Sequence, residues 1–137
     1  MRDNASVELK YMHGKSFFCN QYFELEIKNG IFIGKYITDH ITLDVAQSFV
    51  EESVKITSGK KLPSLFDSRN MKVLETSARK YYAELGSPML ASAVAMLVHG
   101  SSQELVGNLF IHFYKLSVPA KLFTDENKAI QWLEKFI

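Results

Sequence analysis

The chain has 137 residues, a length that favours one domain able to bury its own hydrophobic core. Hydrophobic residues make up 47% of the sequence and charged residues 23%, which excludes a chain that is disordered, collagen-like or coiled coil throughout. Sixteen basic against fifteen acidic residues leave a formal net charge of +1, so we expect no nucleic-acid partner.

Cysteine and histidine content bears on compartment and ligands. The single cysteine, Cys19, can form neither an intrachain disulfide nor a zinc site, and the four histidines lack metal-ligand spacing. We therefore predict no metal, no cofactor and a reducing compartment. The first ten residues do not resemble a signal peptide, and the longest nearly apolar stretch, 89–98, is too short to span a membrane. We expect a cytoplasmic protein.

The first clear element is a β-hairpin, after which helices and strands alternate. Residues 22–27 alternate between apolar and polar side chains, Asn29 and Gly30 favour a type I′ turn, and 31–37 form the return strand. Helical spacing of apolar residues predicts four helices, the first capped by Thr42, the second beginning near Thr76, the third after Ser102 and the last capped by Thr124. Short apolar runs predict further strands at 62–66, 90–98 and 120–123.

The predicted order is ββαβαβαβα, a single α/β domain. Strands that alternate with helices imply right-handed crossovers and a mainly parallel sheet, whose first strand is antiparallel because of the hairpin. Strands 62–66 and 90–98 are apolar on both faces, so we predict that they are parallel neighbours in the centre of the sheet. The domain is expected over 21–137. Residues 1–20 are an N-terminal extension, either with an extra strand at 7–12 or as a loose segment.

One edge of the predicted sheet gathers polar side chains. The carboxyl ends of parallel strands share an edge, and ligands of such sheets usually bind there. Segments 38–40, 67–69 and 99–101 each follow a predicted parallel strand. We therefore name Asp39, His40, His99 and Ser101 as a candidate ligand-binding edge.

Three features of the sequence carry a family resemblance. The opening hairpin runs directly into a helix. The strand 62–67 is followed by a loop and then by Glu75-Thr76-Ser77-Ala78 at a helix start, and the strand 120–123 leads through a short turn into the last helix. In these features the chain resembles the anti-sigma-factor-antagonist (STAS) domain, including its STAS/SEC14-like relatives. The resemblance implies a non-enzymatic protein-interaction or regulatory module of bacterial type.

The resemblance also implies a regulatory motif: an acidic residue, a phosphorylatable serine and a glycine at a helix start. Glu75 matches the acidic position and Ser77, with Thr76 beside it, matches the serine, whereas Ala78 replaces the glycine. The same two hydroxyls also suit simple helix capping. A phosphate there would add about two negative charges to a contact surface. For a protein partner (a kinase or regulator) or a second copy, we expect that surface to comprise Asp67, Ser68, Arg69, Glu75, Arg79 and Lys80.

Two other functions stay open. Ten Phe, six Tyr and one Trp are many for this length, so Phe49, Phe110 and Phe113 either belong to the core or a subunit interface, or line a pocket. A SEC14-like carrier would hold an apolar or anionic ligand in such a pocket. An enzyme is the third alternative, because Ser, His and Asp residues share the predicted edge. No Gly-x-Ser-x-Gly elbow is present, so we expect binding rather than catalysis and assign no catalytic residue.

Overall fold

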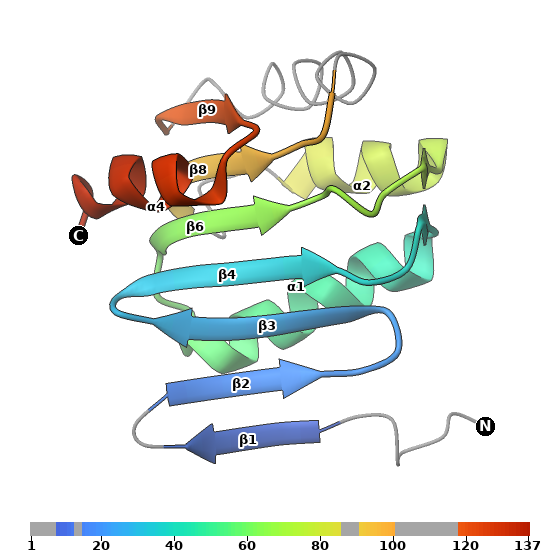
Figure 1. Ribbon diagram of the computed structural model, residues 1–137. Helices are drawn as coiled ribbons and strands as arrows, with labels where there is room; N and C mark the ends of the chain where they lie inside the picture. Colours follow the sequence, from blue (N-terminus) through green and yellow to red (C-terminus); the bar gives the residue numbers. More distant parts are fainter. Residues whose placement is uncertain (1–7, 13–14, 86–90, 101–117) are drawn as a thin grey trace.

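The computed structural model describes residues 8–12, 15–85, 91–100 and 118–137, and all elements below lie within these ranges (Figure 1). A hairpin comes before the helices, and both helices and strands follow it, as predicted. The elements in chain order are β1 (Glu8–Met12), β2 (Lys15–Cys19), β3 (Phe23–Lys28), β4 (Ile31–Tyr36), β5 (His40–Ile41), α1 (Leu43–Thr57), β6 (Leu62–Asp67), β7 (Val73–Leu74), α2 (Thr76–Leu85), β8 (Ala91–Leu97), β9 (Ala120–Phe123) and α4 (Glu126–Glu134).

Seven strands form the main sheet in the order β1-β2-β3-β4-β6-β8-β9. The pairs β4–β6, β6–β8 and β8–β9 are parallel, and the hairpin β3–β4 is antiparallel. This arrangement confirms the predicted α/β class and the prediction that β6 and β8 are parallel neighbours away from the sheet edges. The predicted helix after Ser102 lies outside the described residues.

The N-terminal segment adds two antiparallel strands to the sheet. β1 pairs with β2, and β2 pairs with β3 through Phe18 and Leu25. Phe18 is only 3% exposed and belongs to the same hydrophobic cluster as Phe23. The sequence left open either one extra strand at 7–12 or a loose segment; the structure has β1 at Glu8–Met12, and a further strand, β2, that was not predicted.

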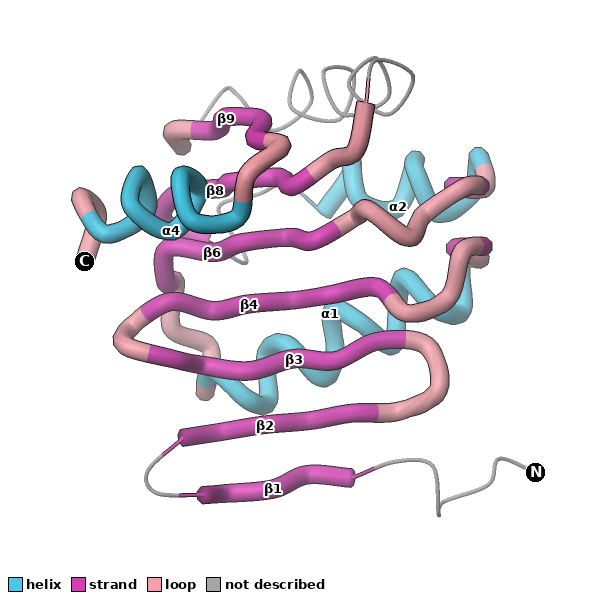
Figure 2. Tube along the Cα trace, viewed as in Figure 1, coloured by secondary structure: helices cyan, strands magenta, loops and turns pink. Residues whose placement is uncertain are grey.

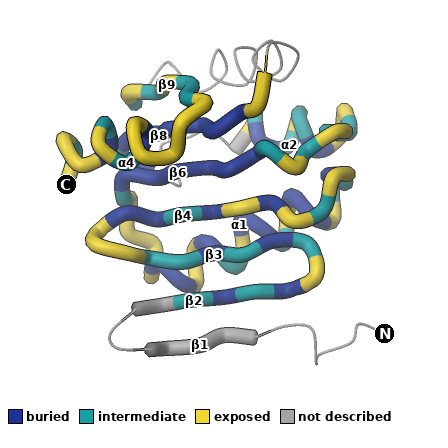
Figure 3. Tube along the Cα trace, viewed as in Figure 1, coloured by how far each residue is buried: buried dark blue, intermediate teal, exposed yellow. Residues whose placement is uncertain are grey.

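Helices cover both faces of the sheet, but unequally. α1 and α2 lie side by side behind the sheet in Figure 1, and α4 lies in front of β6 and β8. Phe49 of α1 and Tyr82 of α2 are buried in the rear core with strand residues such as Phe32, while Leu133 of α4 packs in the front core with Leu65. The strands β6 and β8, between these layers, are the most continuously buried part of the chain (Figure 3).

Local turn and cap chemistry accounts for most element boundaries. Asn29 and Gly30 have φ angles of 52° and 81°, the left-handed backbone expected from the hairpin turn. The hydroxyl of Thr42 accepts a hydrogen bond from the N–H of Val45, so it caps α1 as predicted. The predicted cap of the last helix is wrong by one residue. Asp125, not Thr124, caps α4, and its carboxylate also interacts favourably with the helix dipole.

Candidate functional site at the carboxyl edge

The carboxyl ends of β4, β6 and β8 lie at one edge of the sheet, as predicted from their parallel pairing. A second, two-stranded sheet joins two of the loops there: β5 and β7 pair in parallel, with His40 opposite Val73 (Figure 2). The carbonyl of Asp39 accepts hydrogen bonds from the N–H groups of Lys72 (2.7 Å) and Val73 (2.9 Å). We call the segments 37–41, 67–77 and 98–100 together the carboxyl edge.

A partly buried ion pair fixes the loop after β6. The carboxylate of Asp67 is 7% exposed and accepts two hydrogen bonds from the guanidinium of Arg69, at 3.0 and 2.8 Å. The backbone N–H of Arg69 donates to the same carboxylate, and its Nη2 also lies 3.3 Å from Oε1 of Glu126. The hydrogen bond to Asp67 is the main cause that raises the pKa of Arg69. This pair orders the loop and connects it to α4.

Ser68 makes a second structural tie. Its hydroxyl and its N–H both donate to the carbonyl of Leu97, at 2.9 and 3.0 Å, and the residue is buried. Asp67 and Ser68 were both predicted as contact residues, but both are buried rather than exposed at the carboxyl edge. The predicted residues Glu75 and Arg79 are half-buried and Lys80 is exposed, so these three are accessible from outside.

Glu75 connects the start of α2 to β5. Its carboxylate Oε2 lies 2.6 Å from Nε2 of His40, and its N–H donates to the carbonyl of Ile41. The backbone carbonyl of Glu75 accepts a hydrogen bond from the N–H of Arg79. This bond places Glu75 just before α2.

Thr76 and Ser77 are the first two residues of α2, and both are exposed. Within the described part of the chain, neither hydroxyl has a hydrogen-bond partner. The alternative that these hydroxyls cap the helix is therefore not seen, because the capping position before the first helical residue is occupied by Glu75. Ala78, in the position of the motif's glycine, is fully buried against the core.

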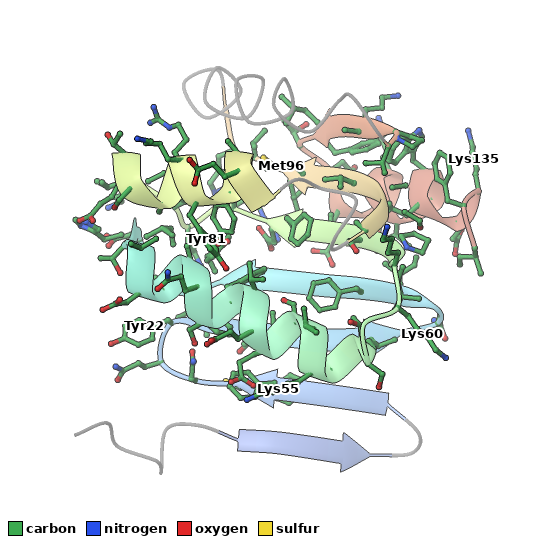
Figure 4. The ribbon with its side chains drawn as sticks, turned by 180° about the vertical axis from the view of Figure 1, so that it is seen from behind. Tyr22, Lys55, Lys60, Tyr81, Met96 and Lys135 are labelled. Atoms are coloured by element: carbon green, nitrogen blue, oxygen red, sulfur yellow. The ribbon has the colours of Figure 1, made fainter. Side chains whose placement is uncertain are left out.

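A cavity of about 370 Å³ opens beside this edge. Tyr22 lies near the first turns of α1 and forms part of the cavity wall (Figure 4). Two of its lining residues were predicted as site residues, His40 at the ligand-binding edge and Glu75 on the contact surface, but the cavity itself was not predicted. A further signal was the four-residue spacing of Asp44 and Ser48, which puts both on one side of α1. The cavity is lined by Tyr22, His40, Thr42, Asp44, Val45, Ser48 and Glu75.

Exposed hydrophobic side chains also mark the carboxyl edge. Among the described residues, four large hydrophobic side chains are exposed, and two of them belong to this edge: Ile37 at 39% and Val73 at 46%. Val54 on α1 and the last residue, Ile137, are the other two. Isolated exposed hydrophobics are ordinary, but here two lie on loops that the β5–β7 pair joins.

The remaining predicted residues separate into three groups. Asp39 and His99 are exposed at the carboxyl edge, whereas Ser101, Phe110 and Phe113 lie outside the described residues. Phe49 is 1% exposed and lies in the core, where its ring stacks on Tyr36 at 4.6 Å between centroids. Within the described ranges no cluster of His, Cys, Asp and Glu side chains could hold a metal ion, and no helix is long and apolar enough to cross a membrane.

Comparison with known proteins gives one family match. The model of a family described as a domain of unknown function, DUF7793, matches residues 25–137. The chain belongs to the DUF7793 family. No curated protein matches this DUF7793 chain in sequence.

Solved structures show which fold this DUF7793 member shares. One is the crystal structure of an uncharacterized protein of the DUF3478 family from Shewanella loihica PV-4, described as having a SpoIIAA-like fold. It is 17% identical, with a TM-score of 0.57, over 97% of this chain and 98% of its own. A second, a protein of unknown function from Arthrobacter sp. FB24, is 25% identical over 80% of this chain and 97% of its own, with a TM-score of only 0.31. The SpoIIAA-like fold is that of the STAS domain, so the predicted resemblance holds for the fold.

Proposed function

We propose that this DUF7793 domain is a cytoplasmic protein-interaction module that binds a regulatory partner, or a second copy, through the carboxyl edge. The observation that carries the proposal is that Ile37 and Val73, two exposed hydrophobic side chains, lie on loops that the β5–β7 pair joins. Glu75 and Lys80, which follow Val73 in the sequence, are accessible charged residues. Protein contacts commonly combine an apolar centre with a polar rim.

The structure beneath this surface favours recognition by a preformed site. Bonds from Arg69 to Asp67, and from Ser68 to Leu97, hold the loop after β6. The β5–β7 pair joins this loop to the one after β4. A surface held in this way loses little conformational freedom on binding, which favours affinity.

Two matched substitutions test the proposed surface. We expect Val73→Asp and Ile37→Asp each to weaken association with the partner recovered from the native host by about tenfold or more, because a charge would be buried at an apolar contact. Val54→Asp is the control, since Val54 is 41% exposed but lies on α1. Pull-down and native mass spectrometry on the folded variants report both partner binding and self-association. Equal association by all three variants would contradict the proposal.

We further propose that phosphorylation of Ser77, or of Thr76, controls this contact. Both side chains are exposed at the start of α2, where a phosphate is favoured by the helix dipole and lies close in sequence to Arg79 and Lys80. The added charge would change the polar rim of the carboxyl edge without entering the core.

Substitution of Ser77 tests this regulation. Ser77→Ala should change the free energy of unfolding by about 0.5 kcal/mol or less, because the exposed hydroxyl has no partner among the described residues. Ser77→Asp should stay folded while its association weakens about tenfold. Chemical denaturation and the pull-down above measure the two effects. The regulation is contradicted if Ser77→Asp associates like the wild type and protein from the native host carries no phosphate at either position.

A further inference from the structure

We propose that the cavity between α1 and the start of α2 receives an arginine side chain of the protein partner. The inference deepens the proposed function and rests on it, since the arginine belongs to the partner. The cavity volume of about 370 Å³ falls within the range of roughly 300–1,000 Å³ seen for small-ligand sites, so it can hold a side chain of this kind. It also adjoins the carboxyl edge, because His40 and Glu75 belong to both.

The charged groups that line the cavity favour a cation. Asp44 is exposed in the first turn of α1, and within the described part of the chain its carboxylate has no ion-pair partner. Glu75 contributes a second carboxylate, of which only Oε2 contacts His40. The lining thus contains two carboxylates and one imidazole, so a planar guanidinium with several donors is the complementary group.

The uncharged groups match the same occupant. The hydroxyl of Thr42 already accepts a hydrogen bond from the N–H of Val45. The hydroxyls of Ser48 and Tyr22 have no hydrogen-bond partner among the described residues, so they can accept hydrogen bonds from a ligand. Tyr22 also provides an aromatic ring in the wall, and a guanidinium stacks favourably on such a ring.

An anion is the competing occupant, because the N-terminus of α1 lies in the wall. A helix N-terminus carries roughly half a positive charge, and the His40 imidazole adds at most one more. The two carboxylates, of Asp44 and Glu75, outweigh both. A phosphate would therefore meet a net repulsion in this cavity, and an arginine side chain a net attraction.

Titration with a small probe tests the cavity without knowledge of the partner. Acetyl-arginine-amide, added to the full chain, should produce saturable changes in the backbone NMR signals of Val45, Ser48 and Glu75, with a Kd on the order of 1–10 mM. Acetyl-citrulline-amide has nearly the same shape without the charge and should bind about tenfold more weakly or not at all. Inorganic phosphate should produce no saturable change at these signals.

Two variants make the test specific. Asp44→Asn combined with Glu75→Gln keeps the shape of the cavity and should reduce arginine-amide binding about tenfold. Glu84→Gln removes an exposed carboxylate from α2 that does not line the cavity, and should bind like the wild type. Equal binding of the citrulline probe, phosphate binding at these signals, or no saturable change with the arginine probe would each overturn the inference.

Failure of the inference can be distinguished from failure of the proposed function. The inference alone is wrong if the partner still depends on Val73 but binds the Asp44→Asn/Glu75→Gln variant with unchanged affinity. The proposed surface alone is wrong if arginine-amide fills the cavity and this double variant loses the partner, while Val73→Asp keeps it.

Discussion

Gly34→Ala should lower the free energy of unfolding by about 2–3 kcal/mol, the cost of an extra methyl group forced into a packed core. A methyl group on Gly34 would lie 2.6 Å from Cζ of Phe49 and 3.3 Å from its Cε2. The Phe49 ring has little room to move, because it stacks on Tyr36 and makes edge contacts with Phe23. Urea denaturation, followed by fluorescence or circular dichroism, measures the change.

A second substitution checks the cause of this loss. Phe49→Leu removes the ring and leaves space above Gly34, so Gly34→Ala should cost clearly less in a Phe49→Leu background than in the wild type. A Gly34→Ala protein within about 0.5 kcal/mol of the wild type would contradict the packing that we describe for α1 on the sheet.

Loss of the Arg69 side chain should also destabilise the protein strongly, by about 3 kcal/mol. Arg69→Ala would leave the carboxylate of Asp67, which is 7% exposed, without the two guanidinium hydrogen bonds that it now accepts. A buried charge without its partner is costly. The double variant Asp67→Asn/Arg69→Ala also removes the negative charge of Asp67. It should therefore lose less stability than the sum of the losses of the two single variants.

An exposed ion pair is the matched control for this prediction. Lys55 and Glu52 lie 3.3 Å apart on α1, but the lysine side chain is 68% exposed. Lys55→Ala should therefore cost only about 0.5 kcal/mol or less. Denaturant midpoints of the variants give the comparison. Similar losses for Arg69→Ala and Lys55→Ala would contradict the view that the Asp67–Arg69 pair orders the carboxyl edge.

Local sequence signals were sufficient for much of the fold. The Asn29-Gly30 turn and the Thr42 cap depend on a few neighbouring residues, so both could be predicted and both are confirmed. The central strands β6 and β8 could be predicted because their buried residues form continuous apolar runs. These features require no knowledge of distant contacts.

Features that depend on tertiary contacts were missed. β5 and β7 have two residues each, too few for a periodic pattern, and they exist because His40 and Val73 meet across 33 positions of sequence. The strand at 15–19 was not predicted because its sequence does not alternate between apolar and polar residues; its placement depends on pairing with β3. For the same reason the sequence placed Asp67 and Ser68 on a contact surface, although their bonds to Arg69 and Leu97 draw them into the interior.

Hydrogen–deuterium exchange on the complex recovered from the native host tests the central claim, that the domain binds its partner through the carboxyl edge. The free and bound proteins would be compared across all described segments. We predict reduced exchange on binding in 37–41 and in 71–77, with little change in α4. Protection confined to α4 or to the β8–β9 side of the sheet, with 37–41 and 71–77 unchanged, would contradict the account.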